Sequence, residues 1–329
     1  AGLHCQSPYD AVRLQCINKG TVCPFHSHNV NRIYVINTPD GDLSMSDRIE
    51  KLINSAAGKK LLGAMGVTVA TDLQRYNTSQ TSYFVGTVLV GAGENAKLLP
   101  NIQTNLKDSD AQVFYSPDAA AQLAGDADSN ASSERYQALI FDGSGFVDAT
   151  ELVSAYRFFN ANIRKLKSSG RIVILGRPHL QCKTPEAAAT QRALEGLSRS
   201  LAKEVGGKGA TAQLITVAEG AEANLDSSLR FILSPKSAYI SGQVIKVRSA
   251  DTPAIADWHK PLAGKIALVT GASRGIGEAI ADTLARDGAT IVGVDVAPME
   301  ADLNKVMARL NGKAVIADIT SADAPASIA

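Results

Sequence analysis

Short apolar runs rich in branched residues recur along most of the chain, separated by segments whose apolar residues have helical spacing. Such runs predict strands buried on both faces, and their alternation with helices predicts parallel α/β sheets. We expect strands at residues 84–90, 111–115, 138–141, 171–175, 265–270 and 290–294, and helices at residues 47–62, 151–165 and 193–204. This order predicts doubly wound parallel sheets in tandem, of which the second is incomplete.

Three glycines separate the strand at residues 265–270 from a segment with helical spacing. The sequence there is TGASRGIG, residues 270–277. A strand, a glycine turn and a helix N-terminus form an anion site, because free backbone N–H groups and the helix dipole favour a pyrophosphate. The next strand ends in Asp295, 18 residues after Gly277, close to the spacing expected for a carboxylate that binds ribose hydroxyls. Together these features predict a dinucleotide site.

TGASRGIG resembles the cofactor motif of the short-chain dehydrogenase/reductase family, and residues 261–265 and 318–320 are also similar to that family. The resemblance implies α/β, doubly wound (Rossmann-like) domains. The domain order resembles that of the long, high-molecular-weight bacterial 3-oxoacyl-acyl-carrier-protein reductases, in which a degenerate nucleotide-fold domain precedes the active one. The resemblance to the family assigns cofactor binding to Gly271, Ser273, Arg274, Gly275, Ile276, Gly277, Asp295, Val296, Asp318 and Ile319. In the family, the Asp after the third strand usually meets the adenine, and Asp318 and Ile319 inherit that role.

Two residues give opposite indications about the cofactor. Asp295, at the end of the second strand, would accept hydrogen bonds from both ribose hydroxyls and repel a 2′-phosphate, which favours NAD(H). Arg274, just before the second glycine, is a feature that often accompanies NADP(H) in this family. We give Asp295 more weight, because its charge stands beside the 2′ group while Arg274 can swing into solvent. The expected cofactor is therefore NAD(H) rather than NADP(H).

Residues 45–250 resemble the same fold with its chemistry removed. After the first strand, Gly91-Ala92-Gly93-Glu94 lacks a third glycine and places an acid where phosphate would bind. Asp142-Gly143-Ser144-Gly145 replaces the family's Asn-Asn-Ala-Gly, and residues 176–178 replace its catalytic Ser. By alignment, the family's catalytic Tyr and Lys fall on Ala187 and Gln191. We therefore predict a catalytically dead copy of the fold.

The family's reaction requires a Tyr with a Lys four residues later. A tyrosine has an ordinary pKa of about 10, and a lysine one helical turn away lowers it and binds the nicotinamide ribose. None of the eight tyrosines in this chain has Lys at the fourth following position. We therefore predict no catalytic residue in these 329 residues.

Composition excludes few functions. The chain has a net charge of +1, which gives no electrostatic case for nucleic acid or an acidic membrane as partner. No apolar run approaches the roughly 18 residues that span a bilayer, and no signal peptide is recognisable. We expect a cytoplasmic protein.

Three of the four cysteines lie in the first 23 residues, a segment without regular periodicity. Met45 begins a stretch that reads as a natural protein start with a helix cap at Ser46. We expect residues 1–44 to be upstream-translated sequence or a cloning remnant. The alternative is a zinc site, although its spacing fits no common zinc pattern; the ligands would be Cys16, Cys23, His26 and His28.

We therefore expect a non-native segment at residues 1–44, a degenerate domain at 45–250, a linker at 251–264 and the start of an NAD-binding domain at 265–329. Two functions remain open. The parent protein would be a reductase of 3-oxoacyl thioesters carried by acyl-carrier protein or CoA, dimeric when complete, of which this chain is a fragment. Alternatively, the chain as it stands is a non-catalytic nucleotide-fold module for binding or oligomerisation.

Overall fold

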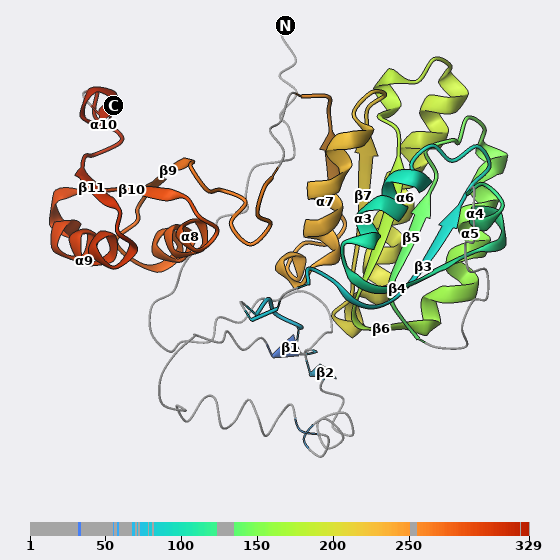
Figure 1. Ribbon diagram of the computed structural model, residues 1–329, viewed down its shortest axis with the longest axis horizontal. Helices are drawn as coiled ribbons and strands as arrows, with labels where there is room; N and C mark the ends of the chain where they lie inside the picture. Colours follow the sequence, from blue (N-terminus) through green and yellow to red (C-terminus); the bar gives the residue numbers. More distant parts are fainter. Residues whose placement is uncertain are drawn as a thin grey trace, which may run out of the picture. The chain divides into compact units, whose positions relative to one another are not determined.

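The computed structural model describes residues 82–123, 135–250, 255–322 and 324–328, with scattered residues between 32 and 80. The chain forms two compact units, Ala1–Ala250 and Asp251–Ala329, which we describe one at a time (Figure 1). The predictions for residues 1–44, including the alternative zinc ligands, and for a helix at 47–62 fall almost entirely outside the described residues.

The first unit is built on a six-stranded sheet in which every neighbouring pair of strands is parallel. Its strands are β3 (Val85–Ala92), β4 (Asp110–Tyr115), β5 (Tyr136–Asp142), β6 (Leu166–Gly176), β7 (Thr211–Val217) and β8 (Val244–Val247), in the order β4-β3-β5-β6-β7-β8. A separate short ladder joins β1 (Arg32–Ile33) to β2 (Thr68–Val69). The sequence-predicted strands of this unit are confirmed, with ends shifted by a few residues.

Helices cover both faces of this sheet, so successive residues of a strand enter different cores. The helices are α3 (Leu99–Lys107), α4 (Pro117–Ala120), α5 (Leu152–Asn162), α6 (Pro185–Val205) and α7 (Leu225–Leu233). On β5, Ala138 and Ile140 pack with α3 and α7, whereas Leu139 and Phe141 pack with α5 and α6. Burial on both faces explains why these strands read as continuous apolar runs.

The second unit is a three-stranded parallel sheet of order β11-β10-β9. Its elements are β9 (Ile266–Thr270), α8 (Gly275–Arg286), β10 (Thr290–Asp295), α9 (Glu300–Leu310), β11 (Lys313–Ile316) and α10 (Ala324–Ile328). Figure 1 shows α8 and α9 on the same side of the three strands. The prediction of two parallel α/β sheets, the second with three strands, is confirmed.

The expected burial of the first strand on both faces is wrong for β9. Val269 lies in the core, but the side chain of Ile266 is 77% exposed and that of Leu268 is 49% exposed. β9 is an edge strand, and both helices that pack on the sheet lie on its other face. The branched apolar residues correctly predicted a strand. Burial of both faces also requires helices on the second face of the sheet, and the described residues place none there.

A pair of glycines tests the packing of the first unit. A Cβ atom at Gly91 would lie 2.3 Å from Cδ2 of Phe158, whereas a Cβ at Gly196, inside α6, would have no atom within 4 Å. We expect Gly91→Ala to lower the free energy of unfolding by about 1–3 kcal/mol through overpacking. We expect Gly196→Ala to raise it by about 0.5–1 kcal/mol, because Ala is the better helix former.

Urea denaturation of the two variants and the parent chain measures both effects. Equal effects of the two substitutions would contradict the packing of Phe158 against β3.

Candidate nucleotide site

The glycine turn after β9 has the backbone conformation that the motif requires. Gly271 and Gly275 have φ angles of 65° and 61°, in the left-handed region that favours glycine. A Cβ at Gly277 would lie 2.0 Å from the carbonyl oxygen of Gly271, so only glycine allows α8 to start this close to the strand. The turn therefore brings the N-terminus of α8 directly to the carboxyl end of β9.

The N-terminus of α8 is open to a ligand. Arg274 stands at its N-cap position and makes no side-chain capping hydrogen bond. Gly271, Arg274, Gly275 and Ile276 are exposed. Backbone N–H groups of a first helical turn that lack a capping side chain are suited to bind an anion. The residues present therefore fit the pyrophosphate of a dinucleotide.

Asp295 ends β10 beside this turn. Its carboxylate accepts a hydrogen bond from the backbone N–H of Ser273, with an N–O distance of 3.1 Å, and another from Val296 at 2.9 Å. Partial burial opposes ionisation, but the hydrogen bonds from Ser273 and Val296 and the charge of Arg274 outweigh it, so the pKa of Asp295 lies below its ordinary value. A fixed negative charge thus stands next to the glycine turn.

The remaining predicted residues lie at the same edge of the sheet, because parallel strands end on one side. Asp318 follows β11, and its carboxylate accepts hydrogen bonds from the N–H and hydroxyl of Thr320 at 2.9 and 2.7 Å. These bonds lower the pKa of Asp318. The side chain of Ile319 is 58% exposed and that of Val296 is 38% exposed. A hydrogen bond thus joins Asp295 to the turn, whereas Asp318 is bonded within its own loop.

The corresponding edge of the first unit is occupied by the chain's own side chains, beginning with Asp142. This buried residue ends β5 and accepts backbone N–H bonds from Leu98 at 2.7 Å and from Ser144 at 2.9 Å. Burial raises the pKa of Asp142, although hydrogen bonds from Ser144 and Leu98 and the charge of Arg177 oppose the shift. Asp142 therefore ties the segment that leads into α3 to the loop after β5.

An aromatic ring fills the space above the first unit's glycine turn. A Cβ at Gly93 would lie 2.0 Å from Cε1 of Phe146, and a Cβ at Gly145 would lie 2.3 Å from the carbonyl oxygen of Asn95. The loops after β3 and β5 are therefore in direct contact at the position where the second unit keeps its turn open. Glu94, which the sequence suggested as the obstacle to phosphate, is exposed.

Gln191 closes the same edge from α6. Its Nε2 donates to the carbonyl oxygens of Gly143 and Phe146, both at 2.9 Å, and its Oε1 accepts from the N–H of Arg177 at 2.7 Å. The side chain of Gln191 is almost fully buried. Gln191 occupies the position to which alignment assigned the family's catalytic Lys, so this position now serves packing.

Arg177, which follows β6, binds residues at and after the end of β7. Its Nη1 donates to the carbonyl oxygens of Val217 and Ala218 at 3.0 and 3.2 Å, and pairs with Glu222 at 2.8 Å. The ends of β6 and β7 are thereby joined. Sequence reasoning missed these closing side chains, because each contacts residues tens of positions away; the one available signal was polar residues at the ends of buried strands.

The family whose model matches this chain is matched in the second unit. Residues 265–327 match the family described as short chain dehydrogenase. The chain is 49% identical over 65 residues to the 3-oxoacyl-[acyl-carrier-protein] reductase FabG of Escherichia coli, a match that covers 20% of this chain and 25% of that protein. It is 44% identical over 73 residues to the oxidoreductase UcpA of E. coli, covering 21% and 26%.

Residues 265–327, in the C-terminal unit, are similar to the short-chain dehydrogenase family. The chain spans about a quarter of the length of the curated relatives that it matches. Among solved structures, a short-chain dehydrogenase/reductase from Serratia marcescens matches with a TM-score of 0.40 and 16% identity, covering 51% of this chain and 98% of that one. The matched residues include the glycine turn and the strands β9, β10 and β11.

The described part of the chain offers neither a metal centre nor a membrane-spanning helix. There, no group of three or more His, Cys, Asp or Glu side chains is placed to hold a metal ion. The helices of that part are all too short or too polar to cross a membrane.

The closed edge of the first unit makes a direct prediction. The two oxygens of Asp142 accept from two different backbone N–H groups, those of Leu98 and Ser144. Asp142→Asn replaces one of these oxygens with an NH2 group, so one buried N–H group loses its acceptor. We expect the free energy of unfolding to fall by about 1–3 kcal/mol. Asp110→Asn, at an exposed position that starts β4, is the matched control and should change it by less than about 0.5 kcal/mol.

Chemical denaturation of both variants provides the measurement. An Asp142→Asn variant as stable as the control would show that this carboxylate does not hold the loops together.

Proposed function

We propose that this chain carries the dinucleotide-binding portion of an NAD(H)-dependent reductase of 3-oxoacyl thioesters. The observation that carries the proposal is the exposed glycine turn hydrogen-bonded to Asp295 at the carboxyl edge of the second unit's sheet. The 49% identity to a 3-oxoacyl-[acyl-carrier-protein] reductase over 65 residues supports the substrate class. In this proposal, the substrate carrier is acyl-carrier protein or CoA, and the complete protein is a dimer that acts in the cytoplasm.

In this proposal, the turn and the residues near it each bind a different part of the cofactor. The first N–H groups of α8, at Gly275, Ile276 and Gly277, would donate to the pyrophosphate. The carboxylate of Asp295 would accept from the adenosine ribose hydroxyls. Asp318 and Ile319 would lie against the adenine. NAD(H), when bound, supplies the hydride; the residues of this chain hold and orient its adenosine half.

The low pKa of Asp295 supports NAD(H) over NADP(H). A carboxylate that stays ionised at neutral pH repels a 2′-phosphate at short range. Arg274 contributes positive charge, but its exposed side chain is already attracted to Asp295.

Substitution of Asp295 tests the cofactor proposal. Asp295→Asn removes the charge and one acceptor, so we expect NADH to bind about tenfold more weakly relative to NADPH than it does to the parent chain. Asp302→Asn, at an exposed position on α9, is the matched control and should leave the ratio unchanged.

Calorimetric titration with NADH and NADPH gives the ratio for all three chains. A parent chain that binds NADPH more tightly than NADH would refute the assignment of NAD(H).

The chain by itself should not catalyse the reaction. No tyrosine in the sequence has the lysine four residues later that the proposed chemistry needs. We expect no oxidation of NADH above background with acetoacetyl-CoA, measured by absorbance at saturating cofactor. A complete short-chain reductase in the same assay is the positive control, and turnover by the purified chain would overturn this expectation.

A second candidate function concerns the first unit, which we propose to be a non-catalytic module. Phe146, Asp142 and Gln191 occupy the edge where a dinucleotide would lie. This observation favours a role in support or assembly over a second cofactor site. Failure of the chain to bind any dinucleotide, with both units folded, would favour the module as the function of the whole chain.

A further inference from the structure

Arg171 is a buried cation without a carboxylate partner in the described part of the chain. It lies on β6 and is 2% exposed. Its Nη1 donates to the carbonyl oxygens of Ser169 and Gly170 at 2.8 and 3.2 Å, and its Nη2 reaches that of Ser234 at 3.4 Å. Its Nε has no hydrogen-bond partner. Carbonyl dipoles therefore offset part of the charge, and no carboxylate among the described residues neutralises it.

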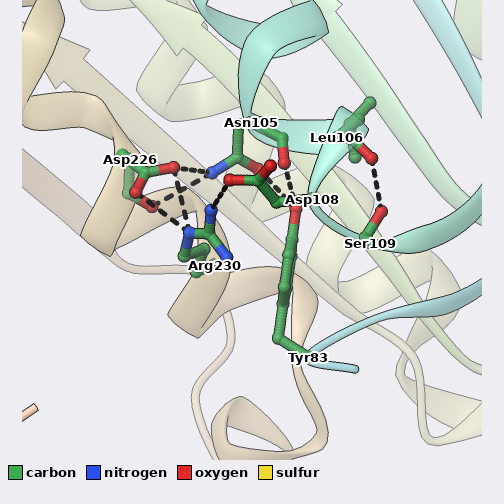
Figure 2. Close-up of polar contacts among 7 residues, drawn as sticks. All are labelled: Tyr83, Asn105, Leu106, Asp108, Ser109, Asp226 and Arg230. Carbon is green, nitrogen blue, oxygen red and sulfur yellow. Dashed lines mark hydrogen bonds and ion pairs between the residues drawn. The ribbon is translucent and has the colours of Figure 1, made fainter. Parts of the chain in front are cut away.

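The other deeply buried arginine of this unit shows the usual solution. Arg230, on α7, pairs with Asp226 through Nε at 2.9 Å and with Asp108 through Nη2 at 2.6 Å. Figure 2 shows its guanidinium between these two carboxylates, with the ring of Tyr83 beside it. Burying an unpaired charge is costly, whereas a hydrogen-bonded pair recovers much of that cost. The contrast with Arg230 indicates that Arg171 lacks a negatively charged partner among the described residues.

A small cavity lies next to Arg171. It has a volume of about 30 Å³, and its lining includes Ser82, Gln137 and Ser169 besides Arg171. A cavity of this size holds one or two particles of the size of water. None of the described residues that line it is acidic.

Two of the residues around this cavity have unusual features. The Oε1 atom of Gln80, which also lines it, is buried without a partner. A half-turn of this amide would direct its NH2 group to the same place as a donor. Ser169 has a φ angle of 53°, rare for a residue with a side chain, and strained backbone of this kind persists where a site requires it.

The charge of Arg171 distinguishes the possible occupants. Burial lowers the pKa of Arg171 to about 10, so the guanidinium still carries its proton at neutral pH. Water in the cavity would satisfy hydrogen bonds but leave the charge unbalanced. An anion would do both, and the volume of about 30 Å³ fits a monatomic ion.

We propose that this cavity, at Arg171 in the first unit, is a binding site for a small inorganic anion of the size of chloride. The ion would be held by the guanidinium of Arg171, the hydroxyl of Ser169 and the amide of Gln80. It would act as the missing counter-charge and stabilise the part of β6 around Ser169 and Arg171. The site belongs to the first unit, whereas the residues to which cofactor binding is assigned belong to the second, so the proposal does not depend on the proposed reductase function.

Thermal unfolding of the 329-residue chain at constant ionic strength tests the proposal, with sodium chloride replacing sodium gluconate. Because a ligand that binds only the folded state raises its stability, we expect the midpoint to rise by about 3 °C between about 5 and 200 mM chloride, with saturation. The rise should be absent in Arg171→Met. It should persist in Arg230→Met, the matched control, whose cation is already paired.

A second measurement does not depend on the variants folding. The ³⁵Cl resonance of a chloride solution should broaden when the parent chain is added, and bromide should reverse the broadening by competition. A chloride effect that does not saturate or is equal in the parent chain and Arg171→Met, or no broadening in the parent chain, would show that the cavity holds only water and would overturn the proposal.

Discussion

Parallel strands direct all their carboxyl ends to one edge of a sheet, and the groups that meet at that edge decide what each unit of this protein can do. In the second unit, the turn at Gly271–Gly277 leaves backbone N–H groups exposed beside a carboxylate. In the first unit, Asp142, Phe146 and Gln191 fill the corresponding space. The two units share a fold class and differ in whether this edge is open.

The closing interactions use polar groups as structural ties. A carboxylate that accepts two backbone N–H groups and an amide that bonds three backbone groups satisfy donors and acceptors that a bound ligand would otherwise meet. Buried networks of this kind are stabilising only when every member has its partner. Gln191 meets that requirement at a position where a lysine would bring a charge into a buried environment.

Local sequence patterns predicted the strands and the glycine turn, because each depends on residues within a few positions of one another; Asp295 was singled out by its spacing from the turn and its place at the end of a strand. The strand predicted at residues 84–90 is Val85–Ala92, for example. Exposure of Ile266 could not be predicted, because burial depends on a second layer that a strand pattern does not report. The role of Gln191 was also missed, because its hydrogen-bond partners Arg177, Gly143 and Phe146 lie far away in the sequence.

The central claim is that the second unit holds the chain's dinucleotide site and that the first unit cannot accept one. Hydrogen exchange of the chain with and without saturating NADH tests it most directly, since both edges are followed in one experiment. The account predicts slower amide exchange at residues 271–278 and no change at residues 91–98 and 142–147. Protection at the first unit's loops, or protection at neither edge, would contradict it.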